Sequence, residues 1–196
     1  MLRYKALLGG KLREIPTFLI NYRLPWGVLV CYHEIPSKFL PFLRHCYEPG
    51  STVPSMEGMS PQEICTCRFL MENEKKKNRR LKIVPQVVKG PWIVKKTADG
   101  KPAIIGSKMP TQFFYSPPNA DLGQAEYLEL DLDIVASSAA RGILAVAQRY
   151  TKTLTLDLGF VVQGNTNDEL PEQMLLGTRI HGLDPVQALA LPEAMY

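Results

Sequence analysis

The chain carries three carboxylates in a period-two row, at Glu129, Asp131 and Asp133, within a segment whose other residues are mainly apolar. On a strand, successive members of such a row project from one face about 6–7 Å apart. Three acids in this arrangement could hold a hard cation such as calcium, or share a proton for acid–base chemistry. The simpler interpretation, which we favour, is a solvated outer face that makes ion pairs with neighbouring basic strands.

Cysteine and histidine offer a second chemistry, but their spacing suits neither a metal site nor a nucleophile. Cys31 and His33 lie two residues apart on an expected strand, where hydrogen-bond contact is rare, and no third group is apparent to orient the histidine. The other such residues lack the paired spacing of a zinc site; they are His45, Cys46, Cys65, Cys67 and His181. No phosphate-binding glycine loop, dinucleotide fingerprint or serine-elbow motif occurs. We therefore expect a non-enzymatic protein with no metal and no cofactor.

Positive charge is concentrated in about a sixth of the chain. Residues 75–108 carry 11 basic side chains and one acid, a net charge of +10. Residues 1–74 carry 8 basic and 7 acidic side chains, a net +1, and residues 109–196 carry 4 basic and 11 acidic, a net −7. The basic segment proper is 75–82, and further lysines follow it on either side of Trp92.

Three interpretations of this segment are open: a solvated linker, a surface that meets anionic lipid, and a surface that binds nucleic acid. We favour lipid over nucleic acid, and expect no nucleic acid partner, because the neighbouring apolar strands lack the interleaved aromatic residues of a base-stacking platform. Trp92 is either a core anchor or an interfacial residue between lysines. The predicted lipid- or anion-binding residues are Lys75, Lys76, Lys77, Arg79, Arg80, Lys82, Lys89, Trp92, Lys95 and Lys96.

The elements that must position these residues are mostly strands. Alternating apolar residues predict strands over 126–134 and 153–163, and helical spacing predicts a helix over 138–152 between them, with Ser138 as its N-cap. A strand pair is expected at 17–24 and 28–33. Further short strands are expected at 81–89, 91–96, 103–105 and 111–115.

Three other segments complete the prediction. Residues 45–62 read as an irregular surface loop, 61–74 as a short helix, and a last helix is expected to start near residues 166–171 and to end near Gly177. These elements indicate an α+β fold, with a largely antiparallel curved sheet packed on one long helix at about 138–152 plus one or two short helices.

Length and composition favour one globular domain. The chain has 196 residues, of which 45% are hydrophobic and 21% charged, enough for a substantial core. Its apolar runs are far shorter than the ~20 residues that a membrane span needs, and four cysteines are too few for a disulfide scaffold. We expect a single domain over 1–196 in a cytoplasmic protein that associates peripherally with membranes.

A series of motifs resembles the C-terminal domain of the plant Enhanced Disease Resistance 2 proteins. They are RLKIVPQVVKGPWIVKK (80–96), KPAIIG (101–106), YLELDLDI (127–134), SSAARG (137–142), ELPE (169–172) and LLG (175–177). The resemblance covers roughly residues 14–190. In the plant proteins this domain follows a pleckstrin-homology domain and a START lipid-binding domain, and no reaction attaches to it. The resemblance also implies a structural pair between Arg141 and Asp133 or Asp131.

Two functions follow as hypotheses. The first is a non-enzymatic module that binds lipid or an anionic membrane, in which apolar strand faces wrap an amphiphile against the 138–152 helix and the basic segment meets head groups. Its partner would be an anionic phospholipid or another amphiphilic ligand. The alternative is a regulatory domain that docks protein partners and has a packed interior without a ligand cavity.

Overall fold

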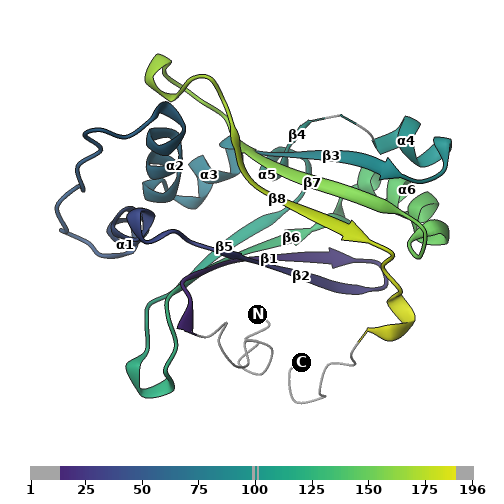
Figure 1. Cartoon of the computed structure of the whole chain (residues 1–196), viewed down its shortest axis with the longest axis horizontal. Coiled ribbons are helices and arrows are strands. Elements are labelled where there is room, and N and C mark those ends of the chain that lie inside the picture. Colours follow the sequence, from purple (N-terminus) through teal and green to yellow (C-terminus); the bar gives the residue numbers. More distant parts are fainter. Residues whose placement is uncertain (1–13, 99, 101, 189–196) are drawn as a thin grey trace.

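The computed structural model describes residues 14–98, 100 and 102–188, and it has an α+β fold with two sheets (Figure 1). The first sheet has the strand order β2-β1-β6-β5. Its strands are β1 (Thr17–Leu24), β2 (Gly27–Glu34), β5 (Thr111–Ser116) and β6 (Tyr127–Asp133). Strand β1 is antiparallel to β2 but parallel to β6, and β5 is antiparallel to β6, so this sheet is mixed.

The second sheet has the order β4-β3-β7-β8 and is antiparallel throughout. Its strands are β3 (Leu81–Lys89), β4 (Ala103–Ile104), β7 (Thr155–Val162) and β8 (Met174–His181). The side chains of Thr178 on β8 and His33 on β2 link the two sheets through a 3.1 Å hydrogen bond.

Helices lie at the two ends of the sheets. Figure 1 shows α1 (Leu40–Tyr47), α2 (Pro61–Met71) and α3 (Glu74–Arg80) at one end, and α4 (Trp92–Ala98) and α6 (Ser138–Ala147) at the other. The remaining α-helix is the single turn α5 (Ile105–Lys108). Short 3-10 turns connect the elements: η2 (Ser37–Phe39), η3 (Ala120–Leu122), η4 (Ile134–Ala136), η5 (Gln148–Tyr150), η6 (Asn167–Glu169) and η7 (Pro185–Gln187).

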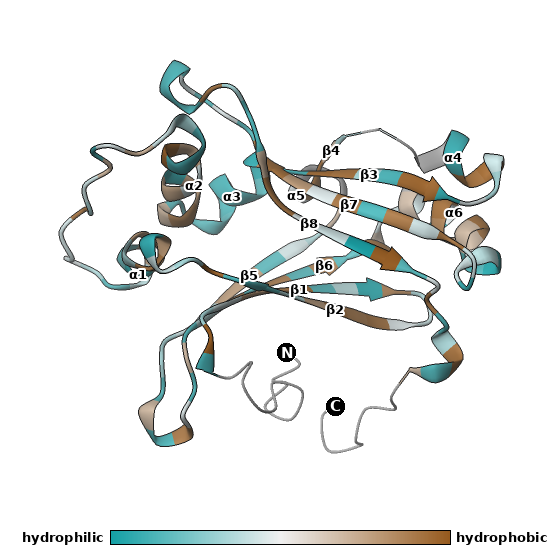
Figure 2. Ribbon diagram, viewed as in Figure 1, coloured by the Kyte–Doolittle hydropathy of each residue, from teal (hydrophilic) through white to brown (hydrophobic). Residues whose placement is uncertain are grey.

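The space between the sheets is filled by side chains from both of them. Tyr22 of β1 and Phe160 of β7 meet with ring centroids 6.3 Å apart, and both are almost fully buried. Leucines 128, 130 and 132 of β6 and residues of α1 and α2 complete this main core. Hydrophobic positions are spread over the strands of both sheets, whereas α3 is almost entirely hydrophilic (Figure 2). The interior is therefore a packed core where the sequence had suggested a wrapped amphiphile.

The prediction of one largely antiparallel sheet on one long helix is wrong, although the α+β class is confirmed. The strands divide into two sheets, and the β1–β6 pair is parallel. The helix after β6 ends at Ala147 and continues only as a 3-10 turn, while the irregular segment is shorter than expected because α1 extends to Tyr47.

Two predicted elements have the wrong type. Residues 91–96 were expected to form a strand, but the Pro91 carbonyl accepts hydrogen bonds from Val94 and Lys95 and so starts helix α4. The segment before Gly177 was expected to end a helix, but it belongs to strand β8, because its backbone pairs with β7. The predicted strands at 17–24, 28–33, 81–89, 103–105, 111–115, 126–134 and 153–163 are confirmed to within a few residues.

Candidate functional site

The ten residues predicted to bind lipid are divided between the two ends of strand β3. Helix α3 precedes the strand and α4 follows it, so their lysines lie on opposite sides of a nine-residue strand, about 26 Å long at its usual rise. Figure 1 shows the two helices at opposite ends of the second sheet. The ten predicted residues therefore form two groups, which we call the α3 group (Lys75 to Lys82) and the α4 group (Lys89 to Lys96).

Within the α3 group, Lys77 is a core residue. Its side chain is 1% exposed, and its ammonium donates to the Leu70 carbonyl at 2.9 Å and to the Glu72 carbonyl, at the C-terminal end of α2. Three aromatic rings surround the same nitrogen, with centroids 5.8–6.0 Å away; they belong to Tyr47, Phe69 and Phe113. Burial lowers the pKa of Lys77. Lys77 therefore ties α3 to α2. Its predicted lipid role would require the ammonium to face solvent, and it does not.

Arg80 is the second buried member of the α3 group. Its guanidinium lies 2.8 Å from Glu72 Oε1 and 2.9 Å from Glu169 Oε2, and its side chain is only 5% exposed. Burial acts to raise the pKa of Glu169, but the Asn165 N–H and the nearby arginines outweigh it, so the pKa is lowered. Arg80 therefore joins α3 to α2 and to the turn after β7.

The other members of the α3 group are accessible. Lys75, Lys76 and Arg79 are exposed, whereas Lys82 is partly buried and pairs with Glu172 at 2.7 Å. This group thus offers three exposed cations, spread along a single two-turn helix.

The α4 group combines exposed cations with an exposed aromatic ring. Trp92 is 70% exposed, and Lys89, Lys95 and Lys96 are all exposed. The Lys96 ammonium lies 5.8 Å from the centre of the Trp92 ring. Val88, just before them on β3, is 43% exposed. An amphipathic ring among lysines is the composition that interfacial membrane sites use.

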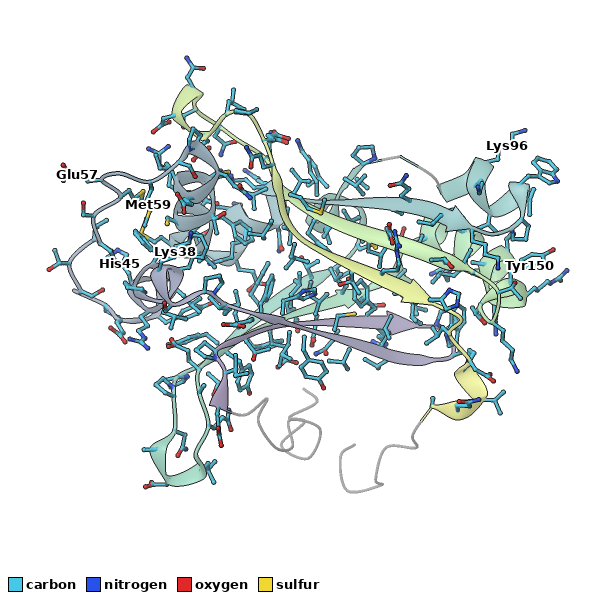
Figure 3. The ribbon with its side chains drawn as sticks, viewed as in Figure 1. Lys38, His45, Glu57, Met59, Lys96 and Tyr150 are labelled. Atoms are coloured by element: carbon cyan, nitrogen blue, oxygen red, sulfur yellow. The ribbon has the colours of Figure 1, made fainter. Side chains whose placement is uncertain are left out.

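A small second core holds this end of the molecule in place. Val94 of α4 is 2% exposed and packs with Val87, Ala147 and Leu154, which come from β3, from α6 and from the segment before β7. Burial of Val94 turns Trp92 towards solvent, so the sequence alternative of a core anchor is wrong for Trp92. Figure 3 shows Lys96 and Tyr150 at this end, far from Lys38 and His45 at the other.

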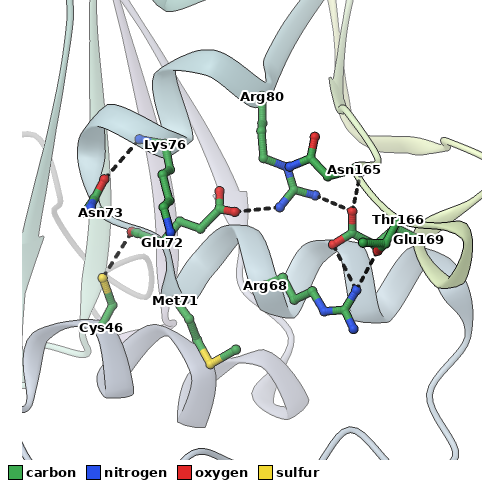
Figure 4. A pocket seen from close by; sticks show the side chains of 10 residues that line it. All are labelled: Cys46, Arg68, Met71, Glu72, Asn73, Lys76, Arg80, Asn165, Thr166 and Glu169. Atoms are coloured by element: carbon green, nitrogen blue, oxygen red, sulfur yellow. Dashed lines mark hydrogen bonds and ion pairs between the residues drawn. The ribbon is translucent and has the colours of Figure 1, made fainter.

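A polar pocket of about 640 Å³ lies at the α3 end (Figure 4). Its walls come from α1, α2, α3 and the segment after β7: Cys46, Arg68, Met71, Glu72, Asn73, Lys76, Arg80, Asn165, Thr166 and Glu169. Arg68 donates to Thr166 at 2.8 Å and to Asp168 at 2.6 Å, so both guanidinium groups of the pocket already hold acceptors. Sequence reasoning missed Arg68, Glu72 and Glu169, whose contacts join residues up to 101 positions apart.

The row of carboxylates is not the solvated face that the sequence favoured. Glu129 is 8% exposed, and Asn21 of β1 donates to both Glu129 and Asp131 at 2.7 Å. Burial, followed by the neighbouring Asp131 carboxyl, raises the pKa of Glu129 to about 7. Through Asn21, the Glu129 and Asp131 carboxyls therefore join β1 to β6.

Arg141 does not pair with the third carboxylate. Asp133 lies 3.4 Å from Arg23 of β1 and caps the turn η4 through the Ala136 N–H. Arg141 instead donates to the Val135 carbonyl. The predicted pair is wrong because η4 intervenes between β6 and α6 and its backbone supplies the nearer acceptor.

Two further observations concern metal binding and membrane crossing by the described residues. No group of three or more His, Cys, Asp or Glu side chains is placed to hold a metal ion in residues 14–98, 100 and 102–188. Over the same part of the chain, none of the helices has the length and apolar character needed to cross a bilayer.

Comparison with known proteins identifies a family for this chain but finds no matching solved structure. Residues 5–184 match the family described as Protein ENHANCED DISEASE RESISTANCE 2, C-terminal. One relative, Protein ENHANCED DISEASE RESISTANCE 2-like from Arabidopsis thaliana, is 31% identical over 147 residues, which is 72% of this chain but only 19% of the relative. No solved structure matches the chain significantly.

Proposed function

The chain belongs to the Enhanced Disease Resistance 2 C-terminal family, and we propose that it is a non-enzymatic module that docks on anionic membrane surfaces through its α4 end. In this proposal the ring of Trp92 enters the interfacial layer. Lys89, Lys95 and Lys96 then lie at the level of the lipid phosphates. Binding is peripheral and places the protein at a cytoplasmic membrane surface.

The exposure of Trp92 is the observation that carries this proposal. The Trp92 ring is 70% exposed, although exposing so large an apolar surface to water is unfavourable. The ring is not needed to hold α4 in place, because Val94 makes the core contact of this helix. A contact with an interfacial layer would give this ring a partner. Lysines on both sides of Trp92 add attraction to anionic lipid of roughly 1 kcal/mol each.

The proposal places no lipid between the two sheets. The side chains of Tyr22, Phe160 and the β6 leucines occupy the space between the sheets, which argues against an amphiphile held between the sheet and α6. This packed interior also fits the alternative of a protein-docking regulatory domain, so the two functions must be separated by measurement.

Vesicle co-sedimentation tests the proposal. Phosphatidylcholine vesicles with phosphatidylglycerol should retain the protein at low salt, and the same vesicles without phosphatidylglycerol should not. The variant Lys95→Glu/Lys96→Glu should lose retention. The matched control Lys75→Glu/Arg79→Glu makes the same charge change at two exposed positions of α3 outside the pocket lining and should lose much less. Equal losses would mean unspecific attraction to net charge, and no retention of the unmodified protein would favour protein docking.

A further inference from the structure

The polar pocket contains an acceptor and a donor that the protein leaves without partners. Glu72 Oε1 binds Arg80, but Glu72 Oε2 is buried and has no hydrogen-bond partner among the described residues. Lys76 lines the same pocket, and its ammonium makes none of the ion pairs found in the described part of the chain. Figure 4 shows the Lys76 side chain extending towards Glu72. A buried carboxylate oxygen without a donor is rare in folded proteins, since it forfeits its hydration.

A simple anion does not suit this pocket. Arg80 is held by Glu72 and Glu169, and Arg68 is held by Asp168 and Thr166, so neither guanidinium is free to receive a phosphate. An anion would also meet the two pocket carboxylates. Of the cationic groups on the wall, only the Lys76 ammonium remains available to it among the described residues.

A bare cation does not suit the pocket either. The lining includes Arg68, Lys76 and Arg80, whose positive charges oppose a metal ion beside Glu72. The described residues also offer no cluster of three metal-ligating side chains. A molecule that carries both an ammonium and an anion would supply a donor to Glu72 and an acceptor to Lys76.

We propose that this pocket binds a zwitterionic head group that pairs a primary ammonium with a phosphate. The ammonium donates to Glu72 Oε2, and the phosphate accepts from Lys76 and from the Asn165 side-chain amide on the pocket wall. The volume of about 640 Å³ lies in the range of ordinary ligand sites and leaves room for a glycerophospho head group. The inference rests on the proposed membrane function for its lipid source, and it names ethanolamine-type or serine-type phospholipids as the lipid class.

Isothermal titration with soluble head groups tests the chemistry directly. O-Phosphoethanolamine should bind, and phosphocholine, which has the same phosphate but no N–H donor, should bind roughly tenfold more weakly or worse. Glu72→Gln should bring the two affinities together, whereas the control Glu74→Gln, two residues away and outside the pocket lining, should leave the preference intact. Lys76→Met should weaken both compounds, and Lys75→Met neither. Thermal unfolding of Glu72→Gln checks the fold, and the Lys76 variant tests the site without touching the Arg80 ion pair.

Vesicles then distinguish a lipid from a soluble source. With phosphatidylglycerol held constant, replacing phosphatidylcholine by phosphatidylethanolamine should increase retention of the unmodified protein but not of Glu72→Gln. An increase seen only with soluble compounds would assign the site to a free phosphorylated amine. Equal binding of phosphoethanolamine and phosphocholine, no binding of either, or indifference to both pocket variants would overturn the inference. Retention through Lys95 and Lys96 would survive each of these results, so the two proposals fail separately.

Discussion

Two adjacent arginines of the basic segment should differ sharply in what they contribute to stability. Arg80 is buried against Glu72 and Glu169, whereas Arg79 is exposed. Replacing Arg80 by Met leaves the Glu169 carboxylate, which is 2% exposed, without its closest cation. Removal of one partner from a buried ion pair costs about 3–5 kcal/mol, while an exposed substitution changes stability by about 0.5 kcal/mol or less.

Thermal unfolding of the two variants measures this difference. For a chain of this size, about 3–5 kcal/mol lowers the unfolding temperature by roughly 6–20 °C. Arg80→Met should show this drop, and Arg79→Met should stay within a few degrees of the unmodified protein. Similar unfolding temperatures for the two variants would refute the reasoning, because they would mean that Arg80 is not held in a buried ion pair.

Three further predictions concern other parts of the molecule. Because the pKa of Glu129 is raised from 4.5 to about 7, the folded state binds the extra proton, and stability should fall as pH rises through this window. Glu129→Gln should remove that dependence in urea unfolding, and an unchanged pH profile would contradict the burial of the carboxyl. Trp92→Ala should reduce vesicle retention without lowering the unfolding temperature, whereas a lower temperature would make the ring structural. Gly106→Ala should destabilise the folded protein by about 1–3 kcal/mol, since the new methyl would lie 2.3 Å from Asn78 Cβ. The control Gly142→Ala, whose methyl would meet nothing within 4 Å, should be neutral or stabilising. Equal effects of the two variants in calorimetry would contradict this packing.

Period-two patterns predicted most strands but not their division into two sheets. The alternation in β1, β6 and β7 identifies which apolar residues face inward, and those residues are buried or partly buried. It does not identify the neighbouring strand, and the parallel β1–β6 pair joins segments 110 residues apart. Contacts of that range depend on the whole chain.

The basic segment shows where composition misled. Its cations were treated as equivalent, although Lys77 and Arg80 stand three residues apart and so share one face of a helix. Had the segment been predicted as a helix, this spacing would have separated the two buried members from Lys75, Lys76 and Arg79. Of the two carboxylates that hold Arg80, one comes from residue 169, and no local pattern indicates that contact.

The fluorescence of Trp92 on membranes tests the central claim most directly. The chain has two tryptophans, so a Trp26→Phe background leaves Trp92 as the only indole reporter. Vesicles containing phosphatidylglycerol should shift the Trp92 emission to shorter wavelength, and lipids brominated near the head group should quench it. Vesicle-bound protein whose Trp92 emission stays unshifted and unquenched would contradict docking through the α4 end.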